Sequence, residues 1–479
     1  MGPLLKARLI DGRELEFFST PVASGGEKVA FFTKDRSHVI CFFFNGLTDR
    51  SERRRRLENI LGKYNVTTGP KGEYWKTHFC WPVAILDGDT SIPKLFLAQN
   101  NIIDPPLAVV SPAYRKNFFF KDTLGSTVEK NGKWFTGEKA RKRLPPDERG
   151  TFLGYLQACT IMARAARRMH FAGLAHSDLS NKNVLIDPKN GEACVIDIDS
   201  LVVPGFAPPS VMGTRGYIAP EVLTGKGHPC IETDRHALAV LIYETLLLRN
   251  PLEGPKVNSR KSPEEDDHLS WGDRALFVEN PADRSNALKP PPAVPMERLG
   301  PYLAALLLKA FVEGLHEPKR RPAADEWERA LYRTFDILHP SPDHSNWFVL
   351  APGMSMRCPF TGKKLTAPVP YAHFYSERRQ GEYGSDGYGL TIYNHRALMG
   401  CHVFAKTLPS DPDGRTRRGY FCFHQGFWYL RNESDDPMEV LAPPCTRIGK
   451  GEHVRITPGL QVKLSTQPNG RVLRFEFMQ

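Results

Sequence analysis

The sequence predicts an α+β protein with a small β-rich N-lobe, a helical C-lobe and a small all-β domain after them. Short β-branched and aromatic runs dominate residues 1–115, and apolar residues at helical spacing follow within residues 116–340. Strand patterns return over residues 356–479, after a Pro-rich stretch at 341–355 that is expected to be a linker. The length of 479 residues is sufficient for about three folded units.

Strands of the N-lobe are expected where apolar runs lie between Gly, Asp and Pro residues. The expected strands are residues 14–18, 28–33, 39–44 and 107–110. A helix is expected at 51–63, because Leu57, Ile60 and Leu61 form an apolar stripe. Four consecutive arginines, residues 53–56, are interpreted as a solvated face of this helix. No aromatic residues interleave with them, so no nucleic-acid footprint is expected there.

Helices dominate the expected C-lobe. Apolar residues between 152 and 169 recur at spacings of three and four, which predicts a long helix. Further helices are expected at 234–248, 301–312 and 323–335. The polar, Pro-containing segment 253–295 is interpreted as a surface connection. In the last domain, strands at 454–456, 460–464 and 472–477 suggest a small β-sandwich.

The composition bears on membrane insertion, secretion, disulfide bonding and the charge of possible partners. The longest apolar stretch, residues 237–248, is far shorter than the ~20 residues that span a bilayer, so no membrane helix is expected. The first 18 residues contain no uninterrupted apolar run that could act as a secretory signal, and a cytoplasmic location is expected. Nine cysteines without a CxxC pair are expected to be reduced thiols. The net charge of +11 permits an anionic partner without requiring one.

The most informative segment runs from His176 to Asn183 and precedes an apolar run. It contains Asp178, and a second apolar run delivers Asp197 and Asp199 fourteen and sixteen residues after Asn183. Phosphoryl transfer from ATP requires oxygen ligands for Mg²⁺ and a carboxylate that orients or deprotonates the accepting hydroxyl. Residues of these types on strand-loop-strand elements therefore predict a phosphoryl-transfer site.

A third motif, GTxxYxAPE, occupies residues 213–221. In this order, HxDxxxxN, DxD in place of DFG, and GTxxYxAPE resemble the catalytic core of a eukaryotic-type protein kinase. The resemblance implies an ATP- and Mg²⁺-dependent enzyme that phosphorylates Ser or Thr of protein substrates. It implies that Asp178 is the catalytic aspartate and that Asn183 and Asp197 serve catalysis by binding the metal, with Asp199 as a further metal ligand.

The same resemblance implies structural pairings and one departure. Glu221 is expected to pair with Arg321, and Asp234 is expected to hydrogen-bond the backbone of the catalytic loop. Ser177 stands where many kinases have arginine, so switching by phosphorylation of the activation segment is less expected.

The phosphate-binding elements of the N-lobe depart further from the kinase pattern. Gly25 and Gly26 resemble a shortened glycine-rich loop, whose N–H groups can approach phosphates, although a plain hairpin turn is the alternative. The strand that should present the ATP lysine has none at the expected position, near Cys41. Lys28, on the preceding strand, resembles the lysine of the with-no-lysine kinases, with Glu58 as its candidate carboxylate partner. A surface lysine and an exposed helical glutamate are the other interpretations.

Two functions of different classes follow. The first is an active Ser/Thr protein kinase. The second is a pseudokinase scaffold that binds nucleotide and partner proteins, because the strand lysine is missing and Asp199 replaces a glycine that adopts positive φ easily. A kinase of small molecules is disfavoured by the GTxxYxAPE segment, which forms a peptide-substrate platform in protein kinases.

The wider resemblance covers the first 340 residues. The phrases at 173–178 and 233–239 resemble bacterial stress-type kinases of tellurite-resistance-like modules. That resemblance implies von Willebrand A-type proteins and metal-dependent Ser/Thr phosphatases as partners. The last domain is faintly similar to forkhead-associated domains but lacks their recognition motifs, so an interaction domain is expected.

A zinc site in the last domain is the weaker of two interpretations. Cys358 begins a segment similar to one knuckle of a zinc ribbon, with Cys401, His373 and His402 as candidate ligands. A buried cysteine that binds no metal is favoured, because Cys358 has no paired cysteine nearby in the sequence.

Overall fold

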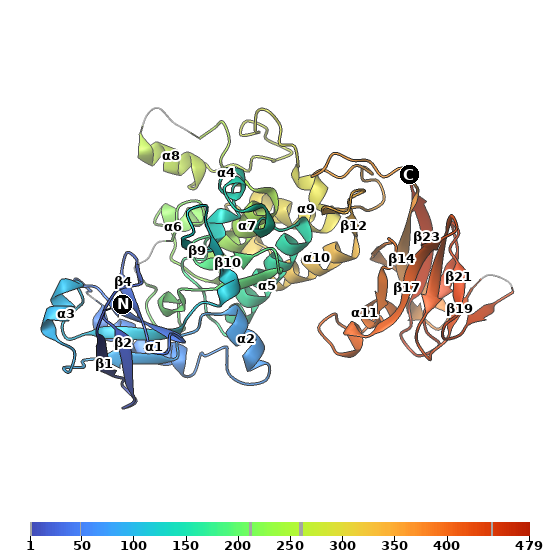
Figure 1. The fold of residues 1–479 in the computed structure, drawn as a ribbon. Coiled ribbons are helices and arrows are strands. Elements are labelled where there is room, and N and C mark those ends of the chain that lie inside the picture. The colour runs from blue at the N-terminus through green and yellow to red at the C-terminus, as the bar shows by residue number, and fades with distance from the viewer. Residues whose placement is uncertain (1, 48, 210–212, 258–261, 442–443) are drawn as a thin grey trace. The chain divides into compact units, whose positions relative to one another are not determined.

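The structure, a computed structural model, describes residues 2–47, 49–209, 213–257, 262–441 and 444–479. It divides into two compact units. The larger unit comprises Met1–Gly150, Gly154–Pro290 and Leu306–Glu328, and the smaller unit comprises Thr151–Leu153, Pro291–Ala305 and Arg329–Gln479. Figure 1 shows the predicted order of a β-rich N-lobe, a helical lobe and a β-rich C-terminal part, which confirms the predicted α+β class.

The N-lobe contains a five-stranded sheet in the order β3-β4-β5-β7-β6. Its strands are β3 (Ala23–Ser24), β4 (Lys28–Phe32), β5 (His38–Phe43), β6 (Ala84–Asp87) and β7 (Leu107–Pro112), and a hairpin of β1 (Leu4–Arg8) and β2 (Glu14–Phe18) adjoins it. Val29 and Phe31 of β4 are buried in one core cluster with Phe17. Because side chains alternate along a strand, Lys28 faces the opposite side of the sheet, next to its cross-strand partner Phe43.

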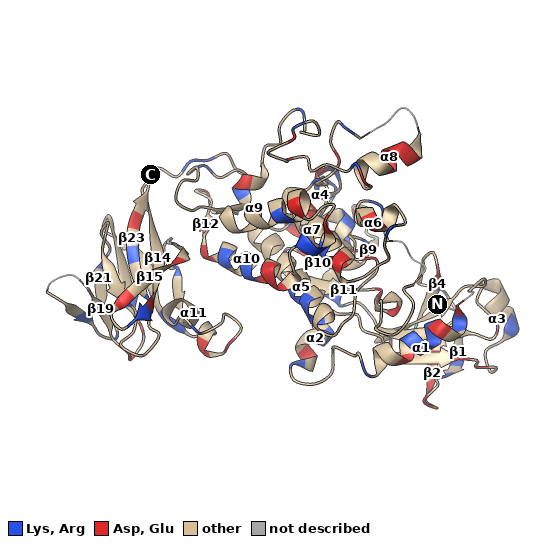
Figure 2. Cartoon of the chain, turned by 180° about the vertical axis from the view of Figure 1, so that it is seen from behind, with Lys and Arg blue, Asp and Glu red and all other residues tan. Residues whose placement is uncertain are grey.

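Helix α1 (Arg50–Leu61) covers that opposite side, where Leu57 packs in a cluster with Phe43. The prediction of a solvated arginine face is wrong for two of the four arginines. Arg53 and Arg56 are 3% and 2% exposed, and they form ion pairs with Glu27 and Asp49 respectively. Blue and red residues accordingly lie close together on α1 in Figure 2. These arginines are occupied inside the chain and cannot form a nucleic-acid footprint.

Two short helices complete the N-lobe, α2 (Gly72–His78) and α3 (Lys94–Gln99). The helical lobe follows, with α4 (Glu138–Lys142), α5 (Phe152–Phe171), α6 (Pro220–Leu223), α7 (Ile231–Leu247), α8 (Pro263–Ser270), α9 (Pro301–Leu308) and α10 (Ala324–Asp336). Its hairpins are β8 (Phe119–Lys121) with β9 (Thr127–Glu129), and β10 (Val184–Asp187) with β11 (Glu192–Val195). None of the helices in the described ranges combines the length and apolar character needed to cross a membrane.

The segment 253–295 is not entirely an irregular connection, because it contains α8. The Ser262 hydroxyl accepts a hydrogen bond from the Glu265 N–H at 3.1 Å, and Pro263 occupies the first helical position. Serine at the N-cap followed by proline is a common start of a helix, so this helix was visible in the sequence.

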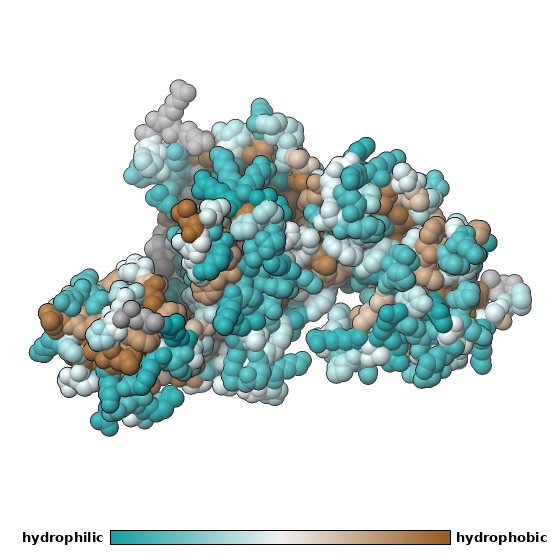
Figure 3. Space-filling view, viewed as in Figure 1, coloured by the Kyte–Doolittle hydropathy of each residue, from teal (hydrophilic) through white to brown (hydrophobic). Residues whose placement is uncertain are grey.

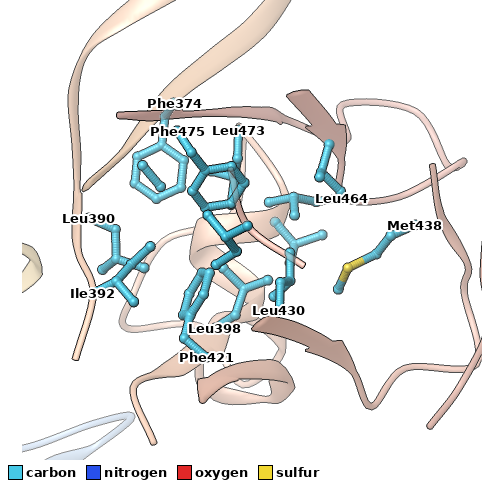
Figure 4. Close-up of a cluster of buried hydrophobic side chains, with 14 of the residues drawn as sticks. Phe374, Leu390, Ile392, Leu398, Phe421, Leu430, Met438, Leu464, Leu473 and Phe475 are labelled. Carbon is cyan, nitrogen blue, oxygen red and sulfur yellow. The ribbon is translucent and has the colours of Figure 1, made fainter. Parts of the chain in front are cut away.

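The smaller unit contains a β-sandwich. Its first sheet has the order β15-β14-β23-β22-β19-β20, and its second has the order β16-β17-β18-β21. The strands are β14 (Val369–Arg379), β15 (Glu382–Thr391), β16 (Ala397–Met399), β17 (Arg417–His424), β18 (Phe427–Asn432), β19 (Met438–Val440), β20 (Thr446–Ile448), β21 (His453–Arg455), β22 (Gln461–Lys463) and β23 (Val472–Met478), and a short helix, α11 (Gly400–Val403), follows β16. Figure 4 shows side chains of both sheets meeting in one core, with Phe374 and Phe475 from the first sheet and Phe421 and Leu430 from the second.

The expected linker at 341–355 is partly ordered structure. Within it, β13 (Trp347–Val349) pairs with β12 (Leu338–Pro340). Phe348 and Leu350 are fully buried, which explains why this Pro-rich stretch also contains an apolar run. The surface in Figure 3 is hydrophilic over most of the visible area, and hydrophobic colour is limited to separate small areas.

The smaller unit contains a buried ion pair that should make its stability depend on pH. His402 Nε2 lies 3.0 Å from Asp336 Oδ1, and the ring stacks on Phe374. Burial by itself lowers the pKa of His402, but Asp336 more than offsets this and the pKa rises to about 9. Because this value is above the ~6.5 of an unfolded histidine, the stabilisation is fully present below about pH 6.5 and is lost as the pH rises through about 9.

We therefore expect the melting temperature of the smaller unit to fall between pH 6.5 and pH 9. Thermal unfolding of the full chain across this range measures the effect. The Asp336→Asn variant is the control, because it keeps the shape of the side chain but removes the charge, and its melting temperature should change less with pH. Equal pH dependence in both proteins would contradict the prediction.

Candidate active site

The catalytic loop lies between α5 and β10 and holds Asp178 and Asn183 together. The Asn183 side-chain amide donates hydrogen bonds to the Asp178 carbonyl at 2.8 Å and to Asp178 Oδ2 at 3.0 Å. The Ile196 N–H donates to the Asn183 carbonyl at 3.0 Å, which ties the loop to the end of β11. Asp178 Oδ1 is buried and has no hydrogen-bond partner among the residues that the structure describes. This arrangement fixes one carboxylate oxygen of Asp178 and leaves the other without a donor from the described residues.

Buried hydrogen bonds connect the catalytic loop to α7 and to the segment after β11. Asp234, near the start of α7, accepts a hydrogen bond from the His176 backbone N–H at 2.7 Å, which confirms the predicted role of this aspartate. The His176 ring contacts the Ile196 carbonyl at 2.8 Å through Nε2. Ser177, with φ of 64°, donates its hydroxyl hydrogen to the Ser200 carbonyl. The Ser177 hydroxyl is therefore engaged inside the chain.

Lys28 reaches from β4 to the DxD motif. Its Nζ lies 2.7 Å from Asp197 Oδ1 and 2.7 Å from each oxygen of the Asp199 carboxylate. The Lys28 and Asp199 side chains are 19% and 7% exposed, and that of Asp197 is 38% exposed. Thus the structure brings together three of the residues that the sequence singled out, although 169 positions separate Lys28 from Asp197.

The electrostatics of this trio follow from burial and proximity. Burial opposes the charge of Lys28, but Asp199 and Asp197 outweigh it and raise the pKa of the ammonium. Burial also opposes the charge of Asp197, yet Lys28 holds its pKa below the ordinary value. The pKa of Asp199 is raised, chiefly by burial and further by the neighbouring Asp197 charge. Lys28 is thus protonated, and it neutralises part of the charge of two closely spaced carboxylates.

The backbone of Asp197 has left-handed torsion angles, with φ of 60° and ψ of 43°. Such angles are costly for a residue other than glycine and are concentrated at functional sites. Asp199 is absent from the positive-φ positions of the described chain and lies instead in a short 3₁₀ turn, Ile198–Ser200. The loss of a glycine at Asp199 therefore imposes no backbone strain at that position.

The Gly25-Gly26 segment forms a tight turn between β3 and β4, closed by a hydrogen bond from the Gly25 N–H to the Lys28 carbonyl at 2.9 Å. A Cβ at Gly26 would meet no atom within 4 Å, and one at Gly25 would meet only the Lys28 carbonyl, at 3.9 Å. Neither residue has positive φ. Packing and backbone geometry therefore do not require glycine at either position.

The predicted pairing of Glu58 with Lys28 is wrong. Glu58 is 41% exposed in its side chain and pairs with Arg54, one helical turn earlier, at 3.2 Å. Arg53 is the buried residue of α1 on the side of the turn: its guanidinium lies 2.6 Å from Glu27 and over the Phe43 ring at 4.9 Å. The sequence interpretation missed Arg53 because it treated the arginine run as one solvated surface.

Cys41, the position at which a strand lysine was sought, lies on the same side of the sheet as Lys28. It is the cross-strand partner of Ala30, two residues after Lys28. Burial raises the pKa of its thiol to about 11, so Cys41 is a neutral neighbour of the charged trio. The neighbouring strand thus supplies the ammonium that β5 lacks.

Tyr217 and Glu221 of the GTxxYxAPE motif are both fixed to the helical lobe. Arg321, which is 1% exposed in its side chain, forms a two-pronged ion pair with Glu221 at 2.7 and 2.8 Å, which confirms the predicted pairing. Tyr217 donates a hydrogen bond to Glu244 of α7, and burial raises the pKa of Glu244 to about 7. The sequence interpretation did not identify this second anchor, because Glu244 occurs within an apolar helix.

The residues at the DxD motif suit a divalent cation. Asp197, Asp199 and Asn183 supply hard oxygen donors, and the ammonium of Lys28 shows that a cation fits between the two carboxylates. In the described part of the chain, no group of three or more His, Cys, Asp and Glu residues could hold a metal ion, so a cation at the DxD motif would depend on Asn183 beside the two carboxylates, and the candidate zinc ligands form no such group. His402 instead contacts Asp336, and His373 contacts Glu476.

Comparison with known proteins agrees with this geometry. Residues 154–324 match the model of the protein kinase domain family. Parts of the chain are 33% identical over 109 residues to the serine/threonine-protein kinase PSK1 of Saccharomyces cerevisiae, and 33% identical over 123 residues to the probable serine/threonine-protein kinase CCRP1 of Zea mays. Atypical protein kinase C of Drosophila melanogaster is 30% identical over 132 residues.

These alignments cover 21%, 24% and 27% of this chain and 8%, 18% and 21% of the relatives. The chain thus spans less than a quarter of the length of each of these curated relatives. Asp178, Asn183 and Asp197 lie inside the matched range, whereas Lys28 and the glycine turn precede it. Residues 154–324 are thus similar to the protein kinase domain family, and the motif order and the anchored catalytic loop agree with this match.

Proposed function

We propose that the protein is an ATP- and Mg²⁺-dependent kinase that phosphorylates Ser or Thr side chains of other proteins. The observation that carries the proposal is the contact of Lys28 with Asp197 and Asp199 at 2.7 Å. It joins the N-lobe, where a lysine is missing from β5, to the metal-binding motif of the helical lobe. The names of the similar proteins, two of them serine/threonine kinases, support the class of substrate.

Each residue has a role in this proposal. The Asp178 carboxylate accepts the proton of the substrate hydroxyl while the hydroxyl oxygen bonds to the γ-phosphorus, and the bond from this phosphorus to the β-phosphate oxygen breaks. Asn183 holds Asp178 in place through its amide hydrogen bonds. Lys28 and the Gly26 N–H orient the phosphates, whereas the Gly25 N–H closes the turn on the Lys28 carbonyl. When bound, ATP supplies the phosphoryl group and Mg²⁺ neutralises the charge that develops on it, at Asp197, Asp199 and Asn183.

The test is phosphate incorporation from γ-labelled ATP into a generic basic protein in the presence of Mg²⁺. We expect Asp178→Asn and Asp197→Asn each to reduce incorporation at least about 1,000-fold, because positioning and charge stabilisation supply nearly all of the catalysis. Asp435→Asn, at a side chain that is 90% exposed, is the matched control and should retain full activity. Full activity in either site variant would overturn the proposal.

The same assay separates an active kinase from a pseudokinase scaffold. The scaffold is favoured by the absence of lysine on β5 and by Asp199 in place of glycine. A wild-type protein that transfers no phosphate, but whose melting temperature rises with ATP, would support the scaffold. Transfer that requires Asp178 would exclude it.

We further propose that the kinase acts in a bacterial stress-signalling module in the cytoplasm. The support is the resemblance of residues 173–178 and 233–239 to stress-type kinases. A von Willebrand A-type protein and a metal-dependent Ser/Thr phosphatase are the proposed partners. Phosphorylation of a purified von Willebrand A-type protein, reversed by the purified phosphatase, is the expected result, and a protein that resists phosphorylation would contradict it.

A further inference from the structure

The second sheet of the β-sandwich has one face in the core and one face turned away from it. Phe421 of β17 and Leu430 of β18 belong to the buried cluster (Figure 4). Side chains alternate along a strand, so the residues next to them in the sequence point to the other side. We define the outer face by Tyr420, Phe427, Tyr429, Arg431, His453 and Arg455.

The formally charged residues on the strands of this second sheet are all basic. Its four strands, β16, β17, β18 and β21, contain no Asp or Glu, whereas Arg occurs on β17, β18 and β21. The opposite sheet, in contrast, has acidic residues on β14, β15, β19 and β23. Arg431, His453 and Arg455 of the outer face are all exposed. This face therefore attracts an anionic ligand.

Cations and aromatic rings alternate across the outer face. Tyr429 lies opposite Arg455, and Arg431 lies opposite both Tyr420 and His453. The Arg455 guanidinium lies over the Phe427 ring at 3.4 Å from its centroid, and Arg431 donates to the Tyr420 hydroxyl at 3.4 Å. Phe427 is 41% exposed, so part of its ring is accessible to a ligand. Each cation thus has an aromatic neighbour on an adjacent strand.

We propose that the outer face binds single-stranded nucleic acid. Bases can stack on the Tyr420, Phe427 and Tyr429 rings, and phosphates can pair with Arg431 and Arg455. A phosphopeptide site would need several donors that converge on one phosphate. Here the cations are spread over two strands and separated by rings, an arrangement that matches a chain of alternating bases and phosphates.

This inference departs from the sequence expectation that nucleic acid is an unlikely partner. That expectation depended on the arginines at 53–56, which lack aromatic neighbours in the sequence and of which Arg53 and Arg56 are paired inside the chain. Interleaving of basic and aromatic residues does occur, but it is created by cross-strand neighbours of β17, β18 and β21. The inference is independent of the kinase activity.

The test is fluorescence anisotropy of the full chain with labelled oligothymidine at increasing salt. We expect binding, with Phe427→Ala and Tyr429→Ala each weakening it about tenfold through lost stacking. Arg455→Gln should weaken it and make its dependence on salt less steep. Arg447→Gln, at a 74% exposed side chain on β20 of the other sheet, is the matched control and should bind like the wild type. Melting temperatures verify that each variant is folded.

Three results would overturn the proposal. The first is no binding of oligothymidine at low salt. The second is an equal loss in Arg447→Gln and Arg455→Gln, which would show attraction to overall charge alone. The third is tighter binding of a phosphothreonine peptide than of oligothymidine, with no effect of Phe427→Ala on the peptide, which would assign the face to phosphoproteins.

Discussion

Replacing Lys28 with methionine is expected to reduce phosphate transfer about 100- to 1,000-fold. The reason is that the Lys28 ammonium contacts both Asp197 and Asp199. These two carboxylates raise the pKa of Lys28 and so keep it protonated. Initial rates of phosphate incorporation from labelled ATP measure the effect. Lys28→Arg retains the charge, so it tests whether a loss in Lys28→Met reflects catalysis rather than the burial of unpaired carboxylates.

Two matched controls accompany this prediction. Lys34→Met removes a 60% exposed lysine just after the same strand, and Glu58→Gln removes the carboxylate that pairs with Arg54 rather than with Lys28. Both variants should keep wild-type activity. A double variant, Lys28→Met with Cys41→Lys, moves the ammonium to the adjacent strand on the same side of the sheet and should regain part of the activity. A folded Lys28→Met protein with full activity would contradict the role of Lys28.

The largest loss of stability is expected from Arg321→Ala, which should lower the free energy of unfolding of the larger unit by about 3–5 kcal/mol. The Arg321 guanidinium donates to both Glu221 oxygens and also to the backbone carbonyls of Gly314, Glu232 and Leu315. Its removal leaves a partly buried carboxylate and several carbonyls without a donor. Thermal and urea unfolding of the full chain measure the loss.

The neighbouring residue offers a close comparison. Arg320 is 57% exposed in its side chain and forms an ion pair with Glu317 at 3.5 Å, so Arg320→Ala should change stability by less than about 1 kcal/mol. Arg321→Lys should rescue little, because lysine lacks the planar fork that meets both carboxylate oxygens. Similar melting temperatures for Arg320→Ala and Arg321→Ala would refute the prediction.

Much of the fold was predictable because its strongest signals are local. Apolar periodicity located α1, α5, α7 and α10 to within a few residues, and runs between turn residues located β2, β4, β5 and β7. The long β14–β15 hairpin was not predicted, since many β15 side chains are small or polar and its pairing with β14 depends on contacts across the sheet.

The candidate site was likewise predictable where local sequence determines it and not where tertiary packing does. Asp178, Asn183 and Asp197 could be proposed from spacing because one strand-loop-strand segment presents them. Glu58 could not be placed, because the rotation of α1 about its axis is set by the burial of Leu57 and Ile60 and by the paired arginines. The result is that Glu58 points to solvent. The rotation of a helix about its axis depends on how the helix packs. A run of four arginines does not indicate which of them face the core.

Lys28 is also an internal counter-ion for Asp197 and Asp199, the carboxylates proposed to bind the metal. Lys28 neutralises part of the charge of Asp197 and Asp199, so in the proposed kinase a divalent cation that binds these carboxylates has to displace the ammonium. A phosphate offers the displaced ammonium a new partner. Metal ion and nucleotide should therefore bind with positive thermodynamic coupling, in which each increases the affinity for the other by the same factor. The consequence is a site that discriminates against either ligand alone and selects the metal–nucleotide complex.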